Sequence, residues 1–321
     1  MLLAVNYHYI RYSFETLYPA FFGITPELFK QQLEELSRHG NFVSGSEIHE
    51  AVSGLKALPE RSIVITFDDG LKEQYEEALP ILDDLGISAI FFVNTFNLQG
   101  KVSEVHKIHL LRSVISPKDF LRHVKDFVRQ IDDYSLNLSE ATLAGTTHYL
   151  YDDAETAALK YLLNFMLPQN VLTSLLDSLF VNFFDENAIA KGLYFSKKQL
   201  GNLLERDMIG SHGHEHLPLG TLTNEQKNFQ VQKSQDLLSG LGGKKVNAFS
   251  YPYGSENACF EMENTLQSNG FTFSFTMKRD VNHLVLDSPF YLSRFDNNDL
   301  PGGKKSKIPS GVNIFDFLSN R

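Results

Sequence analysis

Residues 63–70 read Ile63-Val64-Ile65-Thr66-Phe67-Asp68-Asp69-Gly70, an apolar run that ends in two adjacent carboxylates and a glycine. Such a run is typical of a buried strand. α/β enzymes place their chemistry at the carboxyl ends of such strands. Neighbouring side chains on a strand point to opposite faces, so the two acids can share a site only where the strand turns into a loop. Gly70 permits that turn. An alternative is that both acids only cap the helix expected at 71–85, where the helix dipole favours negative charge.

Short apolar runs alternate with helical patterns along most of the chain. Strands are expected at residues 2–6, 63–67, 89–93, 208–211, 246–251, 271–276 and 290–294. Apolar residues recur with helical spacing at residues 26–39, 71–85, 197–205, 224–238 and 256–268. This alternation predicts an α/β fold with a mostly parallel sheet, either open or closed into a barrel.

Residues 97–192 break the alternation, because they carry helical patterns and almost no strand signal. We interpret them as a mostly helical insertion within a single domain that spans residues 1–321. One hypothesis makes the insertion a packing or dimerisation element, which would give a homo-oligomer. The other makes it a lid or substrate-recognition module, since long insertions after barrel strands lie beside the active site.

Composition narrows the classes of partner. The net charge of −10 argues against a nucleic-acid-binding surface. No apolar run approaches the about 18 residues that a membrane span needs. The single cysteine, Cys259, excludes an intrachain disulfide and fits a reducing compartment. Residues 1–7 lack the features of a signal peptide. We therefore expect a cytoplasmic enzyme.

A histidine cluster follows another expected strand, as Ser211-His212-Gly213-His214-Glu215-His216. His212 and His216 would face the same way on a helical turn, and could bind one metal ion. In an extended segment His214 would share their face and could be a third ligand. The alternative is a solvated loop without metal.

A third segment, Phe249-Ser250-Tyr251-Pro252-Tyr253-Gly254, also ends an expected strand. Together with residues 66–70 and 211–216, it resembles the signature of the polysaccharide deacetylases, the NodB-type carbohydrate esterases of family 4. The resemblance implies a distorted, seven-stranded (β/α) barrel; the helical insertion lies outside it. It also implies a metal-dependent N-deacetylase, a hydrolase of linear amide C–N bonds.

The resemblance assigns roles to the motif residues. Asp68 becomes the general base, and Asp69, His212 and His216 become the ligands of a divalent metal, which leaves His214 a bystander. Zn²⁺ is the expected ion, with Co²⁺ or Ni²⁺ as alternatives. The backbone N–H of Tyr253 would help to stabilise the oxyanion of an acyl-transfer intermediate.

The chain departs from the family pattern at two positions. Many members carry an arginine two residues before the proline of the third motif, where this chain has Ser250. Arg294 is our candidate replacement for orienting the catalytic acid, although it could equally be a surface arginine. The usual Leu-x-His near the C-terminus is also missing, because no histidine follows His283.

A permuted subset of the family carries its acid histidine in a Tyr-His pair on the first strand, and Tyr7-His8 matches that pattern. We therefore predict that His8 is the general acid that protonates the leaving amine. The alternative is a histidine that only orders its neighbours.

The substrate implied by the resemblance is an N-acylated, most simply N-acetylated, amino sugar or glycan precursor. For a cytoplasmic enzyme, a nucleotide-linked, lipid-linked or free sugar is more plausible than an external polymer. Two alternatives remain open. One is a hydrolase of the same fold that cleaves a non-sugar C–N bond. The other is a metal- or glycan-binding module without catalysis.

Overall fold

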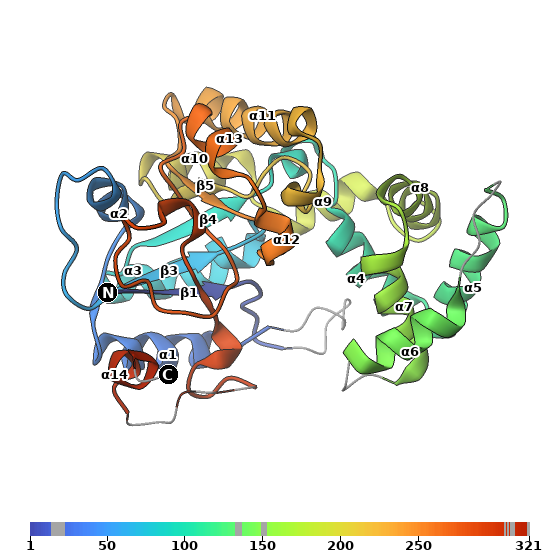
Figure 1. The fold of residues 1–321 in the computed structure, drawn as a ribbon, viewed down its shortest axis with the longest axis horizontal. Coiled ribbons are helices and arrows are strands. Elements are labelled where there is room, and N and C mark those ends of the chain that lie inside the picture. Colours follow the sequence, from blue (N-terminus) through green and yellow to red (C-terminus); the bar gives the residue numbers. More distant parts are fainter. Residues whose placement is uncertain are drawn as a thin grey trace. The chain divides into compact units, whose positions relative to one another are not determined.

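A curled sheet of parallel strands forms the framework of the protein (Figure 1). The computed structural model describes residues 1–13, 23–131, 137–148, 153–304, 306, 308 and 312–319. Seven strands follow one another in the order β7-β6-β5-β4-β3-β1-β8, and β2 pairs with β3 beside this path. The strands are β1 (Leu2–Tyr7), β2 (Asn41–Phe42), β3 (Ser62–Phe67), β4 (Ala89–Val93), β5 (Ile209–Ser211), β6 (Ala248–Ser250), β7 (Phe273–Phe275) and β8 (Phe295–Asp296). The predicted seven-stranded, distorted (β/α) barrel is confirmed as a half-barrel.

One segment links the two edges of this sheet. The Leu292 N–H donates to the Ser274 carbonyl of β7 (2.9 Å), and the Leu292 carbonyl accepts from the Thr276 N–H (2.8 Å). Three residues later, Phe295 pairs with Val5 of β1 at the opposite edge. Arg294 lies between these two attachments and is therefore held at the seam of the half-barrel.

The side chains of the central strands alternate between two apolar clusters, as the twofold periodicity of a strand requires. One cluster includes Leu3, Val5, Tyr7, Ile63, Ile65, Phe67 and Phe91. The other includes Leu2, Ala4, Val64, Ile90, Phe92, Phe273 and Phe275. Because β1 and β3 are buried along their whole length, the strand prediction from their apolar runs is confirmed.

Helices and helical turns connect the strands. The α-helices are α1 (Pro26–Ser37), α2 (Gly45–Val52), α3 (Leu79–Leu85), α4 (Glu104–Val114), α5 (Pro117–Val128), α6 (Leu138–His148), α7 (Ala154–Tyr161), α8 (Gln169–Phe180), α9 (Glu186–Leu193), α10 (Lys197–Glu205), α11 (Asn224–Gly242), α12 (Glu256–Cys259), α13 (Glu263–Ser268) and α14 (Ile314–Ser319). The shorter turns are two π-helical ones, η1 (Gln74–Ala78) and η3 (Leu162–Met166), and four 3-10 ones, η2 (Thr95–Gln99), η4 (Leu219–Thr221), η5 (Pro289–Tyr291) and η6 (Asn297–Asp299).

The packing of α1 shows how sequence positions a helix against the sheet. The Thr25 side chain caps α1 by accepting from the Leu28 N–H, and Pro26 occupies the first turn. Phe29 then packs edge-on against Tyr7 of β1, with ring centroids 4.9 Å apart. This contact fixes α1 against the strand that precedes His8.

Some predicted elements were wrong. The strand expected at 290–294 is instead the 3-10 turn η5 followed by the short strand β8. The Phe290 carbonyl accepts from the hydroxyls of Tyr251 (2.9 Å) and Ser274 (2.5 Å), so side chains occupy an acceptor that a strand ladder would use. The helix expected at 256–268 is divided into α12 and α13.

The chain divides into two compact units. Among the residues that the structure describes, the first contains 1–13, 23–101, 190–304, 306, 308 and 312–319, and the second contains 102–131, 137–148 and 153–189. Within the second, the Lys107 ammonium contacts Asp177 at 2.6 Å and Glu186 at 2.8 Å. The single-domain assignment of residues 1–321 stays a prediction. No helix among the described residues combines the length and apolarity needed to cross a membrane.

Candidate active site

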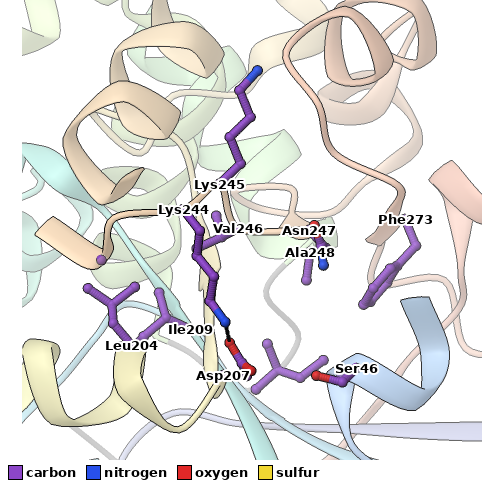
Figure 2. A pocket seen from close by; sticks show the side chains of 13 residues that line it. Ser46, Leu204, Asp207, Ile209, Lys244, Lys245, Val246, Asn247, Ala248 and Phe273 are labelled. Atoms are coloured by element: carbon purple, nitrogen blue, oxygen red, sulfur yellow. Dashed lines mark ion pairs between the residues drawn. The ribbon is translucent and has the colours of Figure 1, made fainter. Parts of the chain in front are cut away.

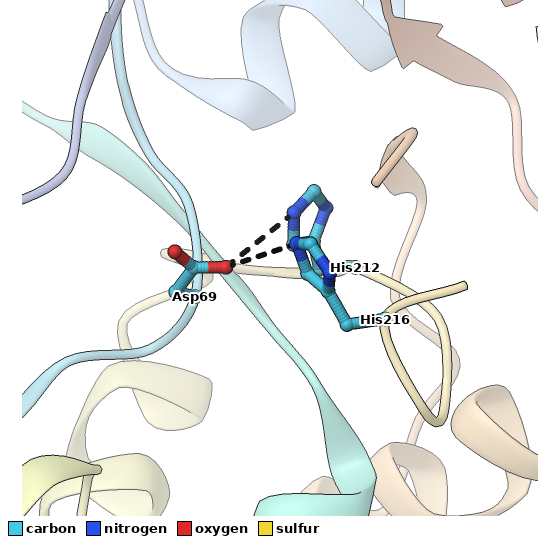
Figure 3. A group of neighbouring side chains, drawn as sticks. All are labelled: Asp69, His212 and His216. Atoms are coloured by element: carbon cyan, nitrogen blue, oxygen red, sulfur yellow. Dashed lines mark ion pairs between the residues drawn. The ribbon is translucent and has the colours of Figure 1, made fainter. Parts of the chain in front are cut away.

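The carboxyl ends of β3 and β5 bring a carboxylate and two imidazoles together (Figure 3). The His216 Nε2 lies 3.4 Å, and the His212 Nε2 3.7 Å, from the Asp69 Oδ1. One ligand atom from each of these three buried residues lies within 4.8 Å of the others. This is the trio that the sequence predicts as metal ligands.

The hydrogen bonding of His212 fits metal coordination. The His212 Nδ1 lies 2.7 Å from the Ser250 carbonyl oxygen, which can only accept, so Nδ1 must carry a proton. In the neutral imidazole this leaves the Nε2 lone pair directed at the Asp69 side. A ligating histidine commonly donates its other N–H to a backbone carbonyl in this way. One carboxylate and two imidazoles suit a zinc-like ion that keeps open positions for catalysis. The residues present therefore fit a divalent metal.

His214 lies in different surroundings. Its Nδ1 is 2.8 Å from the Thr95 hydroxyl, and its ring packs edge-on against Phe96 and Phe229. Burial lowers the pKa of His214 below its ordinary value. The backbone turn at Gly213, with φ of 79°, separates His214 from the face that His212 and His216 share.

Three residues of the site adopt a left-handed backbone conformation that side chains disfavour. The φ angles are 77° at Asp69, 59° at His216 and 63° at Tyr253. Non-glycine residues rarely adopt this conformation, and those that do gather at functional sites. The Tyr253 ring packs against the His216 ring, with centroids 5.0 Å apart. The strain is therefore concentrated around the group of Asp69, His212 and His216.

Asp68 and Arg294 form a buried ion pair beside this group. The Arg294 Nη1 donates to the Asp68 Oδ1 (2.9 Å) and its Nη2 to the Asp68 Oδ2 (2.8 Å). The remaining guanidinium N–H groups donate to the Thr276 carbonyl (3.0 Å), the Thr66 hydroxyl (3.2 Å) and the Ser250 hydroxyl (2.8 Å). All five donors of the guanidinium are thus satisfied, as its burial requires.

This pair determines the protonation of Asp68. Burial alone would raise the pKa of Asp68, but the charge and hydrogen bonds of Arg294, together with His212 and His8, outweigh it, so the pKa falls to about 2. Asp68 is therefore ionised at neutral pH.

Asn6 is a contact of Asp68 that the sequence analysis missed. Its Nδ2 donates to the Asp68 Oδ2 (3.0 Å), and its Oδ1 accepts from the Thr66 hydroxyl (3.2 Å). The available signal was a lone amide in the apolar run at residues 2–7. With Arg294, Asn6 fixes the plane of the Asp68 carboxylate.

His8 follows β1 directly, at the same end of the sheet as Asp68. The Asp68 N–H donates to the carbonyl of Tyr7, the residue before His8 (3.2 Å). The His8 side chain is half-buried, and its interaction with Asp68 contributes to lowering the pKa of that carboxyl group. The topology thus brings together His8 and Asp68, which are far apart in sequence; the role of His8 stays a prediction.

A cleft of about 1420 Å³ opens beside the third motif. Its lining includes Tyr253, Glu256, Asn264, Met277 and Tyr291. The Met277 sulfur also lies 3.6 Å from the Asn6 Nδ2, so the lining reaches the side chains that hold Asp68. Aromatic rings, carboxylates and amides of this kind suit a polar ligand with a flat face.

A smaller cavity, of about 110 Å³, lies at the amino ends of β5, β6 and β7 (Figure 2). Lys244 and Asp207, which both line it, form an ion pair. The amino end of a barrel is where residues serve stability. This cavity is therefore separate from the site at the carboxyl ends.

Comparison with known proteins gives the family. The sequence profile of the polysaccharide deacetylases matches residues 56–116 and 165–274, which is more than half of the chain. A search of curated proteins found no significant match.

Solved structures show the same fold. A de-N-acetylase from Aggregatibacter actinomycetemcomitans is 16% identical, with 95% of this chain and 98% of that chain covered and a TM-score of 0.54. IcaB from Ammonifex degensii is 18% identical, with coverages of 92% and 90% and a TM-score of 0.50. The profile match and the shared fold agree with the motifs, and the chain belongs to the polysaccharide deacetylase family.

Proposed function

We propose that this protein is a metal-dependent hydrolase that removes an N-acyl group, most simply acetyl, from an amino sugar of a glycan or glycan precursor. The observation that carries the proposal is the group of Asp69, His212 and His216 beside the buried pair of Asp68 and Arg294. Membership of the polysaccharide deacetylase family supports the reaction class.

Asp69, His212 and His216 would hold the metal, with Zn²⁺ the expected ion and Co²⁺ or Ni²⁺ as alternatives. When bound, such an ion polarises the amide carbonyl and makes a water molecule more acidic. Its identity is a matter for measurement, because the same donor set accepts several divalent ions.

Asp68 is the general base in this proposal. It takes one proton from the water whose oxygen forms the new bond to the carbonyl carbon. A carboxylate with a pKa of about 2 is ionised at neutral pH but weakly basic, so it needs an acidified water as its partner. Arg294 and Asn6 hold the carboxylate in place during this step.

Tyr253 and His8 act on the carbonyl oxygen and on the leaving nitrogen, respectively. The backbone N–H of Tyr253 donates to the carbonyl oxygen as it gains negative charge. His8 gives its proton to the nitrogen as the C–N bond breaks, which yields the amine and a carboxylic acid. Both residues lie on loops at the carboxyl end of the sheet.

The cleft beside Tyr253 supports a substrate larger than one sugar. Its volume of about 1420 Å³ exceeds the range of about 300–1,000 Å³ that is usual for small-molecule pockets. We therefore favour a glycan or an extended precursor over a free monosaccharide. The isolated Cys259 supports a reducing, cytoplasmic location.

Amine release from N-acetylglucosamine oligomers tests the proposal. Asp68→Asn should keep bound metal and lose about 10²–10⁴-fold in kcat, the usual contribution of a general base. Asp69→Ala and His212→Ala should lose both metal and activity. Full activity in Asp68→Asn would remove the base role, and release from an acetylated polyamine but not from sugar oligomers would contradict the sugar substrate.

A further inference from the structure

Gln74 is a fully buried residue at the start of η1, just beyond the Asp68-Asp69-Gly70 turn. Its Nε2 donates one hydrogen to the Asp68 carbonyl (2.6 Å) and the other to the His8 carbonyl (3.0 Å). Its Oε1 accepts from the Leu71 N–H (3.2 Å). Each of these bonds goes to the backbone, and rotating the amide by half a turn would break all of them.

Gln74 lies beside the point where the pairing of β1 with β3 ends. The regular pairing of β1 with β3 ends at Tyr7 and Phe67, and the Asp68 N–H then makes one more bond, to the Tyr7 carbonyl. Beyond that point His8 and Asp68 lie on the two segments that follow these strands. The Gln74 amide bridges their carbonyl groups and so continues the connection between β1 and β3 past the end of the ladder.

The local helix geometry is consistent with this use. Gln74 begins the π-helical turn η1, which precedes α3. Single π-helical turns are rare and are frequently found at functional sites. The side chain that reaches the two carbonyls belongs to the first residue of this turn.

We propose that Gln74 is a positioning residue that sets the placement of His8 relative to Asp68. The inference rests on the proposed function, in which these two residues are the acid and the base. Gln74 itself contacts neither the substrate nor the metal ligands in this account. It acts through the backbone of the two residues that it joins.

Gln235 provides a matched control. It is also buried, and its Nε2 donates to the carbonyls of Val246 (2.9 Å) and Asn269 (3.3 Å) while its Oε1 accepts from the Val246 N–H (3.1 Å). These bonds lie at the amino end of β6, away from the proposed catalytic residues. Replacing Gln235 removes the same kinds of bond without touching His8 or Asp68.

The experiment compares Gln74→Leu with Gln235→Leu, each in the wild type and in a His8→Ala background, on N-acetylglucosamine oligomers. We expect Gln74→Leu to keep its metal and KM but to lose about 10- to 100-fold in kcat, because small displacements of reacting groups are costly. Gln235→Leu should keep kcat within about threefold of the wild-type value, even if its thermal stability falls as much as that of Gln74→Leu. In the His8→Ala background, Gln74→Leu should lower kcat by a further factor of less than about three. The effects of two coupled residues are not additive, so a residue that acts through His8 has little left to change once His8 is gone.

Two kinetic results would overturn the inference. One is wild-type kcat in Gln74→Leu, and the other is an equal loss in both backgrounds. If His8→Ala keeps full kcat, the acid role in the proposed function fails first, and the positioning role falls with it. Independently of activity, amide hydrogen exchange at Asp68 and Leu71 should accelerate in Gln74→Leu, and unchanged exchange would also exclude the bridge.

Discussion

At the scale of single residues, the pair of Asp68 and Arg294 sets the electrostatics of the site. These side chains lie 226 positions apart in the sequence and are both buried. The third motif has Ser250 where many family members have an arginine, and the Ser250 hydroxyl accepts a hydrogen bond from Arg294. Arg294 therefore extends from the seam of the half-barrel to Ser250, the position at which many family members carry their arginine.

Removing the guanidinium should destabilise the protein strongly. Arg294→Met leaves the Asp68 carboxylate buried without its cation, which should lower the free energy of unfolding by about 3–5 kcal/mol. Arg206→Met is the control, because Arg206 pairs with Asp83 near the surface and should contribute at most about 1 kcal/mol. Urea unfolding of both variants measures the difference, and equal losses would contradict a special role for the buried pair.

The same pair predicts how stability depends on pH in the metal-free protein. The pKa of Asp68 is about 2 in the folded chain and about 3.9 in an unfolded one. A lowered folded pKa stabilises the protein above the unfolded pKa, and this contribution is lost as pH falls from about 5 towards 2. The loss should amount to about 2 kcal/mol for this residue.

Unfolding at several pH values, with a chelator present, tests this linkage. Asp68→Asn cannot titrate and should show a shallower loss of stability below pH 5 than the wild type. Parallel curves for the two proteins would mean that other carboxylates cause the acid sensitivity.

At the scale of elements, the fold places its polar side chains where strands end. Asp69, His212 and Tyr253 follow β3, β5 and β6, whose carboxyl ends lie at one edge of the sheet. The turn after β3 depends on Gly70, whose φ is 64°. A Cβ at Gly70 would lie 2.8 Å from the Val93 Cγ1, so both conformation and space favour glycine there.

Gly70→Ala should therefore lower the stability of the protein more than an alanine substitution at a glycine that has free space around it. Gly86 has a similar φ of 67°, and no atom lies within 4 Å of the place that an alanine Cβ would take, so Gly86→Ala should cost only about 1–2 kcal/mol of backbone strain. Gly70→Ala adds the contact with Val93 and should cost about 1–3 kcal/mol more. It should also weaken metal binding, because Asp69 precedes the displaced turn. Equal thermal stability of the two variants would contradict the steric argument.

The sequence predicts an element well where its backbone groups bond within regular secondary structure, and poorly where distant side chains take those backbone groups. The strands β3 and β4 follow from apolar runs, and α10 from the helical spacing of its apolar residues. The strand expected at 290–294 fails because side-chain hydroxyls take the Phe290 carbonyl. Such bonds depend on tertiary packing, which a local pattern does not contain.

The same distinction applies to the site. Asp69, His212 and His216 belong to contiguous motifs, and the structure brings them together as expected. Asn6, Gln74 and the bridging hydroxyl of Ser250 went unrecognised, because amides and hydroxyls have many uses and no diagnostic spacing. Their contacts with Asp68 and Arg294 exist only because β1 lies beside β3 and the two sheet edges meet near Arg294.

At the scale of the whole molecule, the first unit contains every residue to which we assign a role in catalysis. The described part of the second unit is helical, and the assignment of residues 97–192 as an insertion stays a prediction. Its function as a lid or as a dimerisation element, and hence a homo-oligomer, stays a prediction. The net charge of −10 continues to argue against a nucleic-acid substrate.

Elemental analysis of bound metal tests the central claim most directly, on the wild type beside His212→Ala and His214→Ala. We predict about one zinc-like ion per chain in the wild type, retained in His214→Ala and lost in His212→Ala, because only His212 shares the site with Asp69 and His216. No metal in the wild type after addition of zinc, cobalt or nickel, or equal loss in both variants, would contradict the proposed metal centre.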